Sequence, residues 1–169
     1  MKNVNANSLN ERITIVTSPL SDKSGISTFI NGSQDEGGAL SAFGVDHGQD
    51  GQPLNSNMKY KLVGFSIDAL ISMGVIPEPP RLIQIDVDGN EHIILRGATE
   101  TLKSKELRSL YIEVNDGFQE QAEGVSNILQ ASGFTLSEKN PAVSGQTTDD
   151  ANQYFNQIWT RKVKCKTGG

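Results

Sequence analysis

The sequence has little of what marks disulfide-rich, membrane-spanning or nucleic-acid-binding proteins. Cys165 is the only cysteine among 169 residues, which excludes an internal disulfide and a cysteine-based zinc site. No apolar run approaches the roughly 20 residues that a membrane-spanning helix needs, and residues 1–12 lack the apolar core of a signal peptide. The net charge of −5 provides no basic field for nucleic acid or anionic lipid. We therefore expect a cytoplasmic protein without nucleic-acid or membrane partners.

The apolar residues suffice for one core and are ordered as in an α/β fold. Hydrophobic residues make up 36% of the chain, which suits a single domain of this length. Leu82–Val87 is a nearly continuous apolar strand of the kind found at the centre of a parallel sheet, and Leu110–Val114 is a second buried strand. Helical spacing over Asn90–Leu102 lies between them. The three segments together predict a right-handed parallel crossover.

Further strands and helices are indicated on both sides of this unit. Ser66 is placed to cap a short helix, and a helix around residues 125–129 ends at Gly133. Residues 31–57 are rich in Gly, Ser, Asp and Gln, which predicts a long loop with room for a short strand at 39–43. We expect one domain over residues 1–161 and a flexible tail over 162–169. The other predicted strands are Ile13–Val16, Ile26–Ile30, Lys59–Phe65 and a closing pair at Thr135–Ser137 and Asn156–Thr160.

The most informative stretches are LIQIDVDGNEHIILRGATETL (Leu82–Leu102) and SLYIEVN (Ser109–Asn115). An apolar strand that ends in Asp, an Asp-Gly turn, a Glu, a Leu-x-Gly-Ala helix and a strand that ends in Glu-Val together resemble the signature of the FkbM methyltransferase family. RITIVTSPLSDKSGISTFI (Arg12–Ile30) is similar to the family's third strand and the turn after it. FSIDAL (Phe65–Leu70) is similar to its next helix start, and NQIWTR (Asn156–Arg161) to its closing strand.

The resemblance implies a partial Rossmann-like class I methyltransferase fold, with a mostly parallel sheet and an antiparallel terminal strand. It implies S-adenosylmethionine as cofactor and a hydroxyl of a sugar or small natural product as acceptor. Family members open with two strands that carry a glycine-rich cofactor loop and an acidic ribose anchor. This sequence resembles the part after them, so we expect weak cofactor binding. The alternative is a non-catalytic remnant, or a subunit that self-associates or needs a complementing chain.

Three carboxylates are the candidate catalytic residues. Asp86 and Glu113 close neighbouring predicted strands at the rim where open α/β sheets bind ligands, and Glu91 follows at the helix start. A carboxylate, or a metal ion held by carboxylates, is the expected helper when a hydroxyl loses its proton during methyl transfer. The alternatives are structural: Asp86 and Glu113 can cap strand ends, and Asp88 with Glu91 fits a reciprocal helix cap. No residue is assigned as a metal ligand.

The cofactor contacts are inferred from the resemblance alone. The family places groups near the adenine of the cofactor where its third strand ends. In this sequence that position is occupied by Ser18, Pro19, Leu20 and Ser21.

Overall fold

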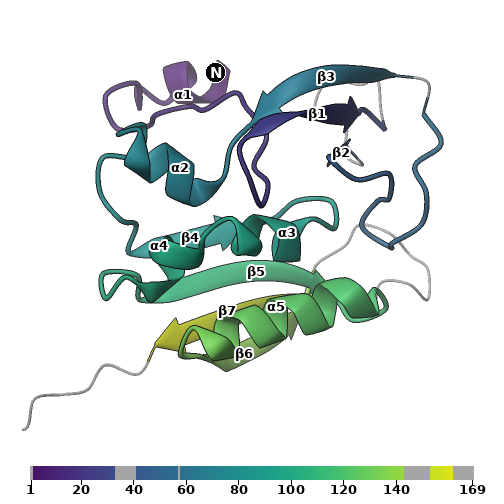
Figure 1. Ribbon diagram of the computed structural model, residues 1–169. Helices are drawn as coiled ribbons and strands as arrows, with labels where there is room; N and C mark the ends of the chain where they lie inside the picture. Colours follow the sequence, from purple (N-terminus) through teal and green to yellow (C-terminus); the bar gives the residue numbers. More distant parts are fainter. Residues whose placement is uncertain (1, 33–40, 57, 143–152, 162–169) are drawn as a thin grey trace, which may run out of the picture.

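The computed structural model describes residues 2–32, 41–56, 58–142 and 153–161. These residues form a mixed α/β arrangement with two separate sheets, which lie toward opposite sides of the view in Figure 1. The α/β class is thereby confirmed. Within the described part of the chain, no helix has the length and apolar character needed to cross a membrane. The predicted tail at 162–169 lies outside the described residues.

The larger sheet has four strands in the order β4-β5-β7-β6. β4 and β5 are parallel, whereas β7 is antiparallel to both of its neighbours, β5 and β6. The sheet is therefore mixed: β4, β5 and β6 run in one direction and β7 runs in the other. The expectation of a mostly parallel sheet is wrong, because only the β4–β5 pair is parallel and β7 lies between β5 and β6. The closing strand pair is confirmed. The bounds are β4 Leu82–Ile85, β5 Ser109–Asn115, β6 Phe134–Pro141 and β7 Tyr154–Arg161.

The main core lies where two helices cover one face of this sheet. Helix α3 (Glu91–Arg96) packs against α5 (Gln119–Ala131), and α5 packs against β5. Alternate residues of a strand point to the same face. Leu110, Ile112 and Val114 of β5 accordingly face the helices and are fully buried.

The helix predicted over Asn90–Leu102 is two helices, so the single-helix prediction is wrong. α3 ends at Arg96, and α4 begins at Thr99 and ends at Lys103. The break falls at Gly97, where a Cβ atom would collide with the carbonyl oxygen of Ser21. The close approach of the chain around Ser21 requires a residue without a side chain, and the helix is interrupted there.

The smaller sheet has three antiparallel strands in the order β2-β1-β3: β1 Gly25–Ile30, β2 Ala42–Phe43 and β3 Lys59–Gly64. β3 leads into α2 (Ile67–Ser72), whose first turn is capped by the Ser66 hydroxyl as predicted. The remaining element is α1, Lys2–Ala6. Part of the strand expected at 39–43 lies outside the described residues, and its described part contains β2.

Two strand predictions need correction. Ile13–Val16 is irregular and not a strand, because its backbone forms no ladder with another strand among the described residues. Its side chains at Ile13, Ile15 and Val16 are 42%, 44% and 38% exposed. The apolar run of β4 predicts a strand at the centre of the sheet, yet β4 is an edge strand of the described four-stranded sheet, and Leu82 is 60% exposed.

Candidate functional site

A cavity of about 490 Å³ lies at the carboxyl ends of β4 and β5. Asp86 and Glu113 line it from the two strand ends, Pro19 and Leu20 line it from the segment before β1, and Phe43 lines it from β2. Parallel neighbours end at the same edge of a sheet, which explains why the two carboxylates meet. Asp86 and Glu113 thus lie at one rim of the sheet and line one cavity.

The two carboxylates differ in environment. Asp86 is exposed, whereas Glu113 is half-buried. Burial raises the pKa of Glu113, and the negative charges of Asp86 and Asp88 raise it further. A carboxylate with a raised pKa is a better proton acceptor near neutral pH than an ordinary one. Glu113 thus has the electrostatic character of a general base, with Asp86 beside it.

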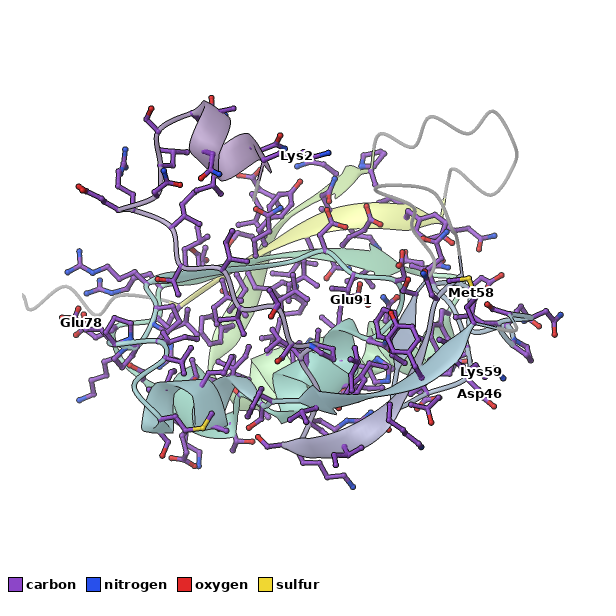
Figure 2. All side chains as sticks on the ribbon, turned by 90° about the horizontal axis from the view of Figure 1, so that it is seen from above. Lys2, Asp46, Met58, Lys59, Glu78 and Glu91 are labelled. Atoms are coloured by element: carbon purple, nitrogen blue, oxygen red, sulfur yellow. The ribbon has the colours of Figure 1, made fainter. Side chains whose placement is uncertain are left out.

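Glu91, the third predicted carboxylate, does not line this cavity. It is 1% exposed, and Figure 2 shows it in the interior of the molecule. Its Oε1 accepts the backbone N–H of Val87 at 3.2 Å, and its Oε2 accepts the side-chain amide of Gln121. Burial raises the pKa of Glu91 from 4.5 to about 7, despite these hydrogen bonds, which lower it. Glu91 is therefore buried beneath the site and does not form part of the cavity surface.

Gln121 is a site-related residue that the sequence analysis did not single out. Its Oε1 accepts the backbone N–H of Asn115 at 2.8 Å, and Gln121 itself is 2% exposed. The sequence does contain a signal for it, because Gln121 lies in line with Val125 and Leu129 on the buried face of α5. A polar residue at an apolar position of a helix needs a buried partner.

The reciprocal helix cap expected for Asp88 and Glu91 does not form. Asn90 is the N-cap of α3 and makes no side-chain cap hydrogen bond. Asp88 Oδ2 instead accepts the backbone N–H of Ser41 at 2.9 Å. The long segment before β3 lies close enough for its backbone to donate to this carboxylate, and this hydrogen bond replaces the expected helix cap.

Residues 41–54, within the predicted long loop, are docked on the acidic edge of the sheet. Gly89 has a φ of +95°, and a Cβ there would lie 2.7 Å from the carbonyl oxygen of Gly48. Asn115 Nδ2 donates to the Gln49 carbonyl oxygen at 3.1 Å, and the His47 ring meets Phe118 edge to face. The segment therefore forms one wall next to the cavity.

The four predicted cofactor-contact residues are divided between two cavities. Pro19 and Leu20 line the acidic cavity, whereas Ser21 lines a second cavity of about 440 Å³. Ser18 precedes them and is half-buried. The segment is held beside β3 because Ser21 N donates to the Phe65 carbonyl oxygen at 2.9 Å. The structure thus brings Pro19 and Leu20, but not Ser21, to the carboxylates.

The lining of the acidic cavity fits part of S-adenosylmethionine. Pro19 and Leu20 provide apolar surface for an uncharged base, and Asp86 and Glu113 provide negative charge for a sulfonium centre. The lining contains no Lys or Arg side chain, among the described residues, to pair with a carboxylate. No group of three or more His, Cys, Asp or Glu side chains in the described ranges is placed to hold a metal ion.

The fold and the site define an α/β protein with an acidic cavity at the carboxyl ends of parallel strands. The family model of the methyltransferase FkbM domain matches residues 1–138. The chain belongs to the FkbM methyltransferase family. Comparisons with curated proteins and with solved structures gave no match.

Proposed function

We propose that this chain transfers a methyl group from S-adenosylmethionine to a hydroxyl of a small molecule, such as a sugar or natural product. Family membership supports the methyltransferase class. The observation that carries the proposal is the meeting of Asp86 and Glu113 in one cavity with Pro19 and Leu20. This arrangement supports a role for the two carboxylates as proton acceptors beside the segment that the family resemblance associates with the cofactor.

The proposed chemistry requires proton removal from the acceptor. Pro19 and Leu20 would contact bound S-adenosylmethionine, which would supply a methyl group on positively charged sulfur; the broken S–C bond would leave its electron pair on that sulfur. The new O–C bond forms as the hydroxyl proton passes to the carboxylate pair. Glu113 is the proton acceptor in this proposal because burial and the Asp86 charge raise its pKa. Asp86, which is exposed, orients the hydroxyl.

The test is methyl transfer from S-adenosylmethionine to a panel of monosaccharides and small phenols, followed by mass spectrometry. Asp86→Asn and Glu113→Gln should each lower kcat by about 10²–10⁴-fold, the usual contribution of a positioned general base. Glu138→Gln, on the exposed part of β6, is the matched control and should retain the wild-type rate. Full activity of both cavity variants would contradict the proposed role of the carboxylate pair.

A second candidate function is that of a non-catalytic remnant or a subunit completed by another chain. The edge of β4 favours it, since Leu82 is 60% exposed and β4 pairs only with β5 among the described strands. An open apolar strand edge invites pairing with a further strand. Light scattering after size-exclusion chromatography should then show an assembly that Leu82→Lys dissociates. A monomeric wild-type chain with methyl transfer activity would contradict this candidate.

A further inference from the structure

The ends of β4 and β5 are joined by a buried chain of hydrogen bonds. The backbone N–H of Val87 donates to Glu91 at 3.2 Å, the side-chain amide of Gln121 donates to the other oxygen of Glu91, and the backbone N–H of Asn115 donates to Gln121 at 2.8 Å. We call the two side chains in the middle the Glu91–Gln121 link. It spans from the first residue after Asp86 to the second residue after Glu113.

The direction of this chain is determined by its ends. A backbone N–H can only donate, so Val87 and Asn115 each require an acceptor. Gln121 satisfies Asn115 with its amide oxygen, which leaves its NH₂ group to face Glu91, and Glu91 then has to accept at both of its oxygens. All three hydrogen bonds can form when one of the two middle side chains is a carboxylate and the other is an amide.

Burial separates this link from any molecule in the acidic cavity. Glu91 and Gln121 are 1% and 2% exposed, and neither lines that cavity. A carboxylate without access to the cavity cannot take a proton directly from an acceptor bound there. Its contacts instead fix the peptide groups beside the two carboxylates that do line the cavity.

We propose that Glu91 is a positioning residue that acts through Gln121 to set the relative placement of Asp86 and Glu113. This inference rests on the proposed function, because the placement matters only if the two carboxylates act on one substrate. The link also reaches the wall of the site, since the Asn115 side chain holds the Gln49 carbonyl oxygen at 3.1 Å. Losing the link would therefore disturb both the acidic pair and the docked segment 41–54.

Three variants test the link. Glu91→Gln places two NH₂ groups against each other, or leaves Asn115 N–H without an acceptor if Gln121 flips. Gln121→Glu places two carboxylates together in a buried site. The exchange variant Glu91→Gln/Gln121→Glu again has one carboxylate and one amide, and it satisfies Val87, Asn115 and the contact between the two side chains.

We expect each single variant to lower kcat and kcat/KM together by about 10²-fold, the size of effect that small misplacements of catalytic groups produce. The exchange variant should return to within about threefold of the wild type, because it restores the hydrogen-bond pattern. If Glu91 were itself the proton acceptor, the exchange variant would remain inactive because the carboxylate has moved to α5. That result would overturn the positioning role.

A second readout does not depend on activity. Hydrogen exchange followed by NMR should show faster exchange at the Val87 or Asn115 amide in each single variant and wild-type protection in the exchange variant. Gln130→Glu, at an exposed position of α5, is the charge-matched control and should change neither amide. Unchanged protection in both single variants would refute the link. Faster exchange in the single variants, together with no methyl transfer by the wild-type chain, would retain the link and refute the proposed function.

Discussion

The two sheets differ in how much of each is buried. In β5 of the four-stranded sheet, Leu110, Ile112 and Val114 have no exposed surface, whereas in the three-stranded sheet Ile26 is 74% and Val63 is 48% exposed. The larger sheet has helices α3 and α5 on one face and contains most of the hydrophobic core. The smaller sheet contributes aromatic side chains to the acidic cavity. The comparison indicates that the larger sheet supplies most of the stability together with the carboxylates of the site, and that the smaller sheet adds aromatic lining.

The largest expected effect is on stability and uses isoleucines from the two sheets. Ile112→Ala should lower the free energy of unfolding by about 3–4 kcal/mol, because it removes buried methyl groups and leaves a cavity. Ile26→Ala should lower it by less than about 1 kcal/mol, because most of that side chain is already in water. Urea unfolding followed by circular dichroism measures both. Equal losses would refute the assigned division of roles between the sheets.

The second largest expected effect is on the pH dependence of the free energy of unfolding, and it comes from Glu91 beside the larger sheet. Burial raises the pKa of Glu91 from 4.5 to about 7. The folded protein therefore keeps a proton that the unfolded chain releases between these pH values. Because folded Glu91 holds this proton more tightly, the folded state is stabilised; this stabilisation is complete below pH 4.5 and is lost as the pH rises through about 7. It amounts to roughly 3 kcal/mol.

The Glu91 contribution can be isolated with Glu91→Gln as the reference. The difference in free energy of unfolding between wild type and variant should fall by roughly 3 kcal/mol from acidic to neutral pH. His92 acts in the opposite sense, because burial, and then the charge of Arg96, lower its pKa. Since His92 and Glu113 are present in both proteins, their contributions cancel in the difference. A difference that does not vary with pH would show that Glu91 titrates normally.

Local pattern was sufficient to predict the parallel pair of β4 and β5 and the placement of Asp86 and Glu113 at one edge, but it did not place β4 correctly within the sheet. Apolar runs identify β4 and β5, and a parallel pair places its strand ends at one edge, so the position of both carboxylates follows from the order of the segments. The α/β class is likewise determined by that order. The Rossmann-like assignment stays a prediction.

The features that the sequence did not predict depend on partners distant in the chain. The break at Gly97 arises from the approach of Ser21, and Asp88 is recruited by Ser41. Ile13–Val16 has strand-forming residues, but a strand also requires a neighbour whose backbone hydrogen-bonds to it. A single sequence indicates which secondary structure each segment favours, but it does not indicate which distant segments come into contact.

A smaller stability effect is expected at the contact that connects the two regions. Asp68 of α2, which follows the smaller sheet, accepts hydrogen bonds from the backbone N–H groups of Glu100 and Thr101 and from the Thr101 hydroxyl, at 2.8, 2.9 and 2.6 Å. Asp68→Ala should cost about 1–2 kcal/mol, since it removes a charged cap of α4. Asp50→Ala, whose carboxylate accepts the Gln52 N–H two residues along the chain, is the local control. Chemical denaturation measures the free energy of unfolding of both variants. A loss for Asp68→Ala no greater than that for Asp50→Ala would show that the contact between α2 and α4 does not stabilise the fold.

The smallest effect compares a lysine from each sheet. Lys139 of β6 pairs with Asp116 at 2.5 Å and lies 4.3 Å from the centre of the Phe155 ring, whereas Lys61 of β3 donates to the uncharged Thr28 hydroxyl at 2.8 Å. Lys139→Ala should therefore lower the free energy of unfolding by about 0.5–1 kcal/mol, and Lys61→Ala by less than about 0.5 kcal/mol.

Added salt separates the contribution of the Lys139–Asp116 ion pair from that of the Phe155 ring, because salt screens the ion pair. The cost of Lys139→Ala should shrink in 1 M sodium chloride by about half, while that of Lys61→Ala should not change. Equal costs at low salt would show that even the surface contacts of the two sheets are alike, against the division that the buried residues indicate.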